Sequence, residues 1–158
     1  MKRAFTLIEI LVSITILVLI SGGALVYINN FNNQQQLIAS RNEVVSALKL
    51  AQSYAKTRQV PLGSTETDLK YVQFQMLGSN LVAGANGIGS TFFASQIGKN
   101  INLSIGISPT VLYFWGGNGF LSSDNKGTLY KDSESAKIIL KSETKQREII
   151  IKALGLIE

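Results

Sequence analysis

The chain opens with Met1-Lys2-Arg3-Ala4-Phe5-Thr6-Leu7-Ile8-Glu9-Ile10-Leu11-Val12, and the apolar run that starts here continues to Ile28. A helix over residues 5–28 would be about 36 Å long, enough to cross a bilayer core of about 30 Å. Glu9 is the exception in this run, because a carboxylate in lipid costs roughly 2.5–3.5 kcal/mol even on lenient insertion scales. A simple anchor has no use for such a residue. Glu9 is therefore the first candidate functional residue, and it requires a positively charged partner.

The residues around Glu9 indicate what that partner is. The tract from Ala4 to Val12 resembles the N-terminal signature of type IV pilins and of the pseudopilins of type II secretion. The resemblance implies that a prepilin peptidase cuts between Ala4 and Phe5, removes a leader at residues 1–4 and N-methylates Phe5. It also implies that Glu9 directs assembly. The chain departs from the family in one place, because it has Ala4 where the family usually has Gly.

Cleavage after Ala4 would leave a charged amine on Phe5, in or near the apolar phase. Two buried opposite charges stabilise each other only where they meet. In a helical stack, the amine of one subunit would lie against Glu9 of its neighbour, which favours one axial register. We therefore interpret Glu9 as the residue that selects the assembly register. Two alternatives remain open here: a secretory signal peptide cut near residues 22–24, and a plain signal anchor.

Charge and composition restrict the function further. The 158 residues carry a net charge of +5, and Lys2 and Arg3 before the span predict a cytoplasmic N-terminus, with everything after Ile28 outside the cytoplasm. The chain has no Cys and no His, which excludes disulfides, thiolate or imidazole metal sites, and serine–histidine or cysteine–histidine catalysis. We predict a single-pass protein of the inner membrane that binds no cofactor and is not an enzyme.

A second helical segment follows the apolar run. Polar residues at 29–36 lead into apolar residues at helical spacing, namely Leu37, Val44, Leu48, Ala51 and Ala55. No Pro or Gly occurs between Ala24 and Gln59, so we predict one long helix over residues 5–58, with Pro61 as the stop signal. Its half at 5–28 spans the membrane, and its half at 29–58 is amphipathic.

The hydrophobic period changes from helical to two beyond residue 68. Val72, Phe74 and Met76 alternate with polar residues, as in a half-buried strand. Similar short segments follow at 80–83, 91–94, 101–107, 111–115, 128–130, 137–141 and 148–152, separated by turn residues such as Asp124 and those at 84–87. We predict an extracytoplasmic β-rich domain at 59–158 and an α+β, pilin-like fold class. One long N-terminal helix packs on a C-terminal antiparallel sheet.

Two later tracts narrow the resemblance. The helix end at residues 48–58 and the tail at residues 147–155 are similar to the GspH/FimT-type minor pseudopilins, although a generic pilin stays open. The resemblance implies a structural subunit of a type IV pilus or of a type II secretion pseudopilus. The partners it implies are other pilin subunits in a helical filament, a prepilin peptidase, and an assembly ATPase with its membrane platform.

Nucleic-acid binding is the second function to consider. Some minor pilins of this type bind DNA through basic residues near the C-terminus. The basic residues available here are Lys137, Lys141, Lys145 and Arg147. The acidic residues among them are Glu134, Glu143 and Glu148, and this mixture favours a solvated sheet face over a DNA site. A DNA-binding minor pilin of a competence pilus remains the alternative.

Overall fold

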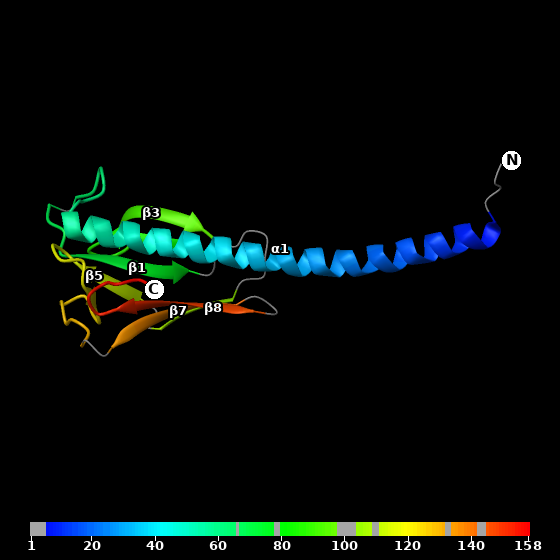
Figure 1. The fold of residues 1–158 in the computed structure, drawn as a ribbon. Helices are drawn as coiled ribbons and strands as arrows, with labels where there is room; N and C mark the ends of the chain where they lie inside the picture. Colours follow the sequence, from blue (N-terminus) through cyan, green and yellow to red (C-terminus); the bar gives the residue numbers. More distant parts are fainter. Residues whose placement is uncertain are drawn as a thin grey trace. The chain divides into compact units, whose positions relative to one another are not determined.

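The computed structural model describes residues 6–65, 67–77, 80–97, 104–108, 111–131, 134–141 and 145–158, and of residues 23–26 and 104–108 it describes the backbone alone. Within these residues the chain forms one helix, α1, followed by strands β1 to β8 (Figure 1). The chain divides into two compact units, Met1–Gln35 and Gln36–Glu158. A long N-terminal helix followed by antiparallel sheets confirms the predicted pilin-like α+β fold class.

Helix α1 comprises Leu7–Thr57, close to the predicted range of 5–58. Its start is marked by Thr6, whose carbonyl oxygen accepts hydrogen bonds from the backbone N–H groups of Glu9 (3.1 Å) and Ile10 (3.4 Å). Polar residues at 29–36 continue the helix and do not form a loop, because no Pro or Gly interrupts the backbone hydrogen bonds there.

The C-terminal end of α1 is a Schellman motif. The N–H of Arg58 donates to the carbonyl of Ala55, and the N–H of Gln59 donates to the carbonyl of Tyr54, both at 3.2 Å. These bonds satisfy two of the carbonyls that a helix end leaves free. Arg58 has a left-handed φ of 51°, a conformation that usually selects glycine. Arg58 therefore sets the end of the helix, before the chain reaches Pro61.

The first unit contains the apolar half of α1. This helix is long and apolar enough to cross a membrane, and its most apolar stretch is not buried against the rest of the chain. The exposed fraction is 82% for Leu7 and 59% for Leu11. The hydroxyls of Ser13, Thr15 and Ser21 each donate to the carbonyl four residues earlier, at 2.7–2.8 Å. These polar groups are thus satisfied within the helix, as a lipid environment requires.

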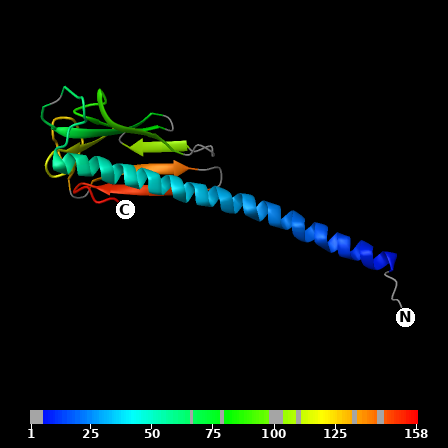
Figure 2. The ribbon, with the colours of Figure 1, turned by 90° about the horizontal axis from the view of Figure 1, so that it is seen from above.

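The second unit contains two antiparallel sheets (Figures 1 and 2). The five-stranded sheet has the order β3-β2-β1-β5-β6, and the three-stranded sheet has the order β4-β7-β8. The strands are β1 Tyr71–Leu77, β2 Asn80–Ala85, β3 Ser90–Gln96, β4 Ser104–Ser108, β5 Val111–Trp115, β6 Leu121–Ser122, β7 Ser135–Lys141 and β8 Gln146–Lys152.

One hydrophobic core joins the second half of α1 to both sheets. The helix contributes the predicted stripe, and all its members are buried: Leu37, Val44, Leu48, Ala51 and Ala55. The five-stranded sheet contributes residues such as Phe74 and Phe114, and the three-stranded sheet contributes residues such as Ile138 and Ile149. Burying a side chain of this size stabilises the fold by about 1.5–3 kcal/mol. The amphipathic half of the helix therefore completes the core of both sheets.

A buried amide fixes the helix to the turns of this unit. Gln52 is 9% exposed, and its Nε2 donates to the carbonyl oxygens of Gly119 (3.1 Å) and Gly155 (2.9 Å). Gly155 has a φ of +77°, and a Cβ at this position would lie 2.0 Å from Gln52 Nε2. The two turns thus approach the helix closely, and both depend on the same side chain.

The β domain differs from the prediction in two places. Strand β2 runs to Ala85, so the predicted turn at 84–87 is displaced to residues 86–89. Gly84 lies inside the strand, paired with Gln73 of β1, and a Cβ there would be 2.1 Å from the carbonyl oxygen of Gly87, so only glycine fits. The predicted strand at 128–130 was wrong: Leu129 makes only an isolated bridge to Ser122, which belongs to the short strand β6. The predicted strand at 101–107 corresponds to β4, and its first three residues lie outside the described part.

Candidate functional site

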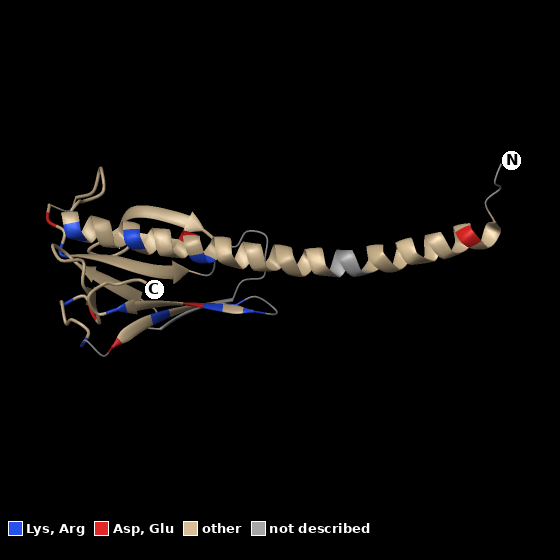
Figure 3. Cartoon of the chain, in the orientation of Figure 1, with Lys and Arg blue, Asp and Glu red and all other residues tan. Residues whose placement is uncertain are grey.

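Glu9 lies in the first turn of α1 and its side chain is exposed. It is the only charged residue between Arg3 and Arg41, and Figure 3 shows it as the isolated red segment near the start of the helix. In the part of the chain that the structure describes, its carboxylate has no ion-pair or hydrogen-bond partner. The first turn carries the positive end of the helix dipole, which stabilises a carboxylate by about 0.3–1 kcal/mol. That is less than the cost of placing the charge in lipid.

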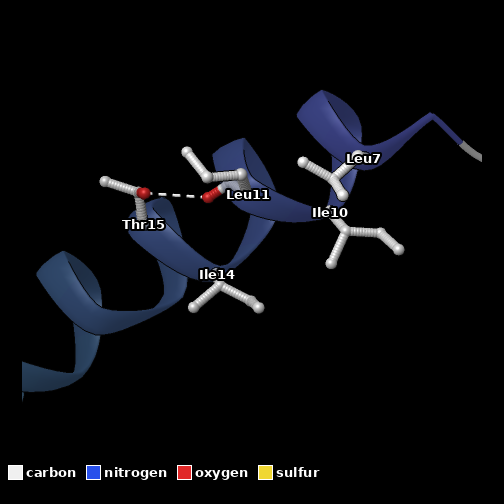
Figure 4. Close-up of a pocket in the computed structure, with 5 residues that line it drawn as sticks. All are labelled: Leu7, Ile10, Leu11, Ile14 and Thr15. Carbon is white, nitrogen blue, oxygen red and sulfur yellow. Dashed lines mark hydrogen bonds between the residues drawn. The ribbon is translucent and has the colours of Figure 1, made fainter.

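An apolar face lies beside Glu9 on the same helix. Leu7, Ile10, Leu11, Ile14 and Thr15 line a shallow hollow on its surface (Figure 4). The Thr15 hydroxyl donates to the carbonyl of Leu11 at 2.8 Å. Its hydrogen bond is thus made within the helix, and a neighbouring helix can contact its methyl group without leaving the hydroxyl unpaired. Side chains three and four residues apart form ridges and grooves that pack against other helices. The geometry is thus suited to helix–helix contact.

The residues predicted for processing, Ala4 and Phe5, lie outside the described residues. The described chain starts at Thr6, and helix α1 starts one residue later. Cleavage after Ala4 and methylation of Phe5 therefore remain predictions from the sequence.

The predicted basic residues are distributed over two faces of the three-stranded sheet. In the antiparallel register of β7 and β8, Lys137 lies opposite Ile150 and Lys141 lies opposite Gln146. Both lysines are exposed, on the face away from the core. Arg147 instead lies opposite the buried Leu140 and so belongs to the other face. Lys145 is exposed and precedes β8.

Arg147 lies in a cleft against the helix. It lines this cleft together with Arg41, Ile38 and Asn42 of α1, and with its neighbours Gln146 and Glu148. Glu148 also lies opposite Ile139, between the two exposed lysines of β7. The four basic residues therefore do not gather into a single patch, and Glu148 lies among the lysines of the outer face and also borders the cleft of Arg147. Proteins that bind the DNA backbone usually do so through a continuous basic patch or groove, which these residues do not form.

Two described groups have a shifted pKa, and one of them, Asp124, stabilises a turn. The carboxylate of Asp124 accepts hydrogen bonds from the N–H and hydroxyl of Thr128 (3.0 and 2.9 Å) and from the N–H of Lys126 (2.9 Å). These bonds, those from Thr128 first, lower the pKa of Asp124 below its usual value. This confirms that Asp124 acts in a turn. Burial, and secondarily the charge of Glu134, raises the pKa of Tyr130.

Among the residues described, no three His, Cys, Asp or Glu side chains form a group able to hold a metal ion.

The structure also brings together residues that the sequence analysis did not single out. Tyr71, Tyr113 and Trp115 lie close together on strands β1 and β5 of the five-stranded sheet. Their alternation with buried residues was visible in the sequence, but their proximity depends on the pairing of β1 with β5.

Comparison with known families identifies the N-terminus. Residues 1–25 match the family model described as "Prokaryotic N-terminal methylation motif", a range that includes Ala4, Phe5 and Glu9. No curated protein and no solved structure matches the chain. The chain therefore carries the prepilin-type N-terminal methylation motif, and this match, together with the helix-and-sheet layout, supports the type IV pilin and pseudopilin family.

Proposed function

We propose that this protein is a structural subunit, a minor pilin or pseudopilin, of a type IV pilus or of a type II secretion pseudopilus. The observation that carries the proposal is the methylation motif at residues 1–25, located on an apolar helix in which Glu9 is the only charge before Arg41. We assign no catalytic role to the chain. Its function is to occupy a defined position in a filament.

The proposed life cycle starts with a precursor in the inner membrane. The N-terminus is cytoplasmic and the β domain faces the periplasm or the exterior. The leader at 1–4 is removed by a prepilin peptidase and Phe5 is methylated. Residues 5–28 span the membrane, 29–58 form the amphipathic half of the helix, and 59–158 form the β domain. The first compact unit ends at Gln35, inside the amphipathic half.

Assembly depends on pairing Glu9 with the amine of Phe5 on an adjacent copy. Two unit charges 4 Å apart attract each other by about 4 kcal/mol at an effective dielectric constant of 20. This is similar in size to the cost of leaving the carboxylate unpaired in lipid. A subunit in the wrong register loses the attraction and retains the cost. The absence of a partner for Glu9 among the described residues supports this pairing.

The apolar face beside Glu9 supplies the rest of the proposed driving force. Leu7, Ile10, Leu11 and Ile14 are all more than half exposed. In the membrane they contact lipid, and in the filament they would pack into the grooves of neighbouring helices. An assembly ATPase and its membrane platform would move the subunit from one environment to the other.

The test compares Glu9→Gln with Glu43→Gln, the same change at an exposed position in the second half of α1, in cells that contain the prepilin peptidase and sibling pilins. Both variants are scored for membrane insertion, leader removal and recovery in sheared filaments. We expect Glu9→Gln to insert normally but to fall at least about tenfold in the filament fraction, which corresponds to about 1.4 kcal/mol. Glu43→Gln should stay close to wild type. Normal filament recovery of Glu9→Gln would overturn the proposal.

A further inference from the structure

The outer face of the five-stranded sheet carries an aromatic platform, which we define as Tyr71, Tyr113 and Trp115. Strand β5 alternates between half-buried and buried residues throughout, β1 does so from Tyr71 to Gln75, and the platform occupies half-buried positions. The rings of Tyr71 and Trp115 have centroids 6.3 Å apart and planes 17° apart, whereas Tyr71 and Tyr113 meet edge to face at 5.4 Å. Their buried neighbours Val72 and Phe114 face the core instead. The platform thus lies on the solvent side of a rigid sheet.

The rings of the platform are held in place. The Tyr71 hydroxyl donates to the carbonyl of Asn86 at 2.8 Å. A Cβ at Gly127 would lie 2.9 Å from the Trp115 ring, so this glycine allows the turn to approach the indole closely. Gly127 also has a φ of +91°, which makes its replacement costly for a second reason. The aromatic surface is therefore pre-organised, which lowers the entropy cost of binding a ligand.

Polar groups border the platform. Gln73 lies directly opposite Tyr113 in the β1–β5 register, and its Nε2 donates to Gln75 Oε1 at 3.0 Å. In the described part of the chain, neither the indole N–H of Trp115 nor the hydroxyl of Tyr113 makes a hydrogen bond. The face thus combines flat aromatic surfaces with amide and hydroxyl groups at fixed positions.

A polar pocket adjoins the platform at Tyr71. Its volume is about 430 Å³, and its other lining residues are Thr67, Asp68, Lys70, Asn86 and Asn125. Asn86 is fixed there by bonds from its side chain: Oδ1 accepts from the N–H of Lys70 and Nδ2 donates to the carbonyl of Asp68, both at 2.8 Å. One acidic and one basic side chain line the pocket, so their charges balance. A carboxylate, an ammonium and an amide together can donate to and accept from neighbouring hydroxyls.

We propose that this face binds an uncharged oligosaccharide. The C–H face of a pyranose ring is apolar and weakly positive, and it is attracted to the electron-rich face of an aromatic ring. Its hydroxyls match the amides of Gln73 and Gln75 and the mixed donors and acceptors of the pocket. Single-stranded nucleic acid also stacks on aromatic platforms, but it requires a positively charged groove. The balanced charges of Asp68 and Lys70 favour a neutral ligand. The proposal concerns the β domain and does not depend on the proposed role in filaments.

Trp115 is the only tryptophan in the chain, so its fluorescence reports directly on the platform. The full-length protein is titrated in dodecylphosphocholine micelles, because detergents with sugar headgroups would compete. The probes are hexamers of β-1,4-glucose, β-1,4-N-acetylglucosamine, β-1,4-mannose and β-1,3-glucose, together with a 15-nucleotide single strand of dT. We expect a saturable change in Trp115 emission with at least one hexamer at millimolar concentration or below, and a weaker response to dT.

Matched variants separate binding from folding. Tyr113→Ser removes one ring of the platform and should weaken binding about 3- to 10-fold, if its contact with the sugar is as strong as one between two aromatic rings. Gln73→Ala should also weaken it. Gln146→Ala, an exposed amide on β8 of the other sheet, should bind like wild type. The proposal is overturned if no hexamer changes the emission, if dT alone does, or if Tyr113→Ser binds the hexamer unchanged while its thermal unfolding matches wild type.

Discussion

The two units of this chain differ in how the apolar surface of helix α1 is covered. In the unit Gln36–Glu158, the stripe from Leu37 to Ala55 is buried against two sheets, and the apolar surface is complete within one molecule. In the unit Met1–Gln35, the large apolar residues from Leu7 to Ile20 are half or more exposed. The difference shows that the second unit is stabilised by its own core, whereas the first depends on an external apolar phase, such as lipid or other helices.

The largest expected effect contrasts one side chain from each unit. Phe74 is completely buried and Leu11 is 59% exposed. Phe74→Ala should lower the free energy of unfolding of the second unit by about 3–5 kcal/mol, whereas Leu11→Ala should leave it unchanged. Denaturant titration monitored by Trp115 fluorescence measures both. An equal loss from both variants would show that the units fold as one.

The next effect concerns the helix–turn contacts inside the second unit. Gln52→Ala leaves the carbonyls of Gly119 and Gly155 without their donor. We expect a loss of about 1–3 kcal/mol in the free energy of unfolding. Ser46→Ala, an exposed residue on the same helix, is the control and should stay within about 0.5 kcal/mol of wild type. If Gln52→Ala behaves like the control, the amide does not tie the turns to α1.

A smaller effect, of opposite sign, is expected at the end of the helix. Arg58 adopts φ 51° in the Schellman motif, where an L-residue with a Cβ is strained by about 1–2 kcal/mol. Glycine removes the strain but adds entropy to the unfolded chain. Arg58→Gly should therefore raise the thermal midpoint slightly, by an amount equivalent to about 0.5–1 kcal/mol. Arg58→Ala keeps the Cβ and should not raise the thermal midpoint. An equal rise in the thermal midpoint for both variants would contradict the explanation.

The smallest effect is a pH dependence in the turn at Asp124. Its folded pKa is lowered from 3.8, chiefly by hydrogen bonds from Thr128. The stability this provides is fully present above the unfolded pKa and is lost as the pH falls through the lower, folded value. Wild type should therefore exceed Asp124→Asn in stability at pH 5, and the difference should shrink below pH 3.8. Thermal melts over this range measure it. A difference that grows on acidification would refute the assignment.

The sequence predicted the helical part of the fold well because its signals are local. The spacing of Leu37, Val44 and Leu48 reports directly on the buried face of α1, and the turn role of Asp124 follows from its neighbours. Less local features were missed. Gly84 looked like a turn residue, but it lies in a strand paired with β1, and glycine is needed there because Gly87 approaches its backbone. The segment at 128–130 has the composition of a strand but makes only one bridge.

The functional residues follow the same division. Glu9 stands out because a single charge in an apolar run is conspicuous without any structure. The arrangement of the basic residues near the C-terminus could not be predicted. Lys137 and Arg147 lie on opposite faces of the sheet, and this follows from the register of β7 and β8. The aromatic platform likewise required the pairing of β1 with β5. Long-range strand register cannot be read from one sequence.

We propose that Glu9 of the first unit pairs with an amine that processing creates on Phe5 of another copy of the chain. Mass spectrometry of the mature protein tests most directly whether that amine exists. Protein isolated from cells that contain a prepilin peptidase should begin at a methylated Phe5, with residues 1–4 absent. Ala4→Gly should give the same terminus with more complete processing. A mature chain that retains Met1, or one that begins near Leu25 after ordinary signal cleavage, would contradict the claim.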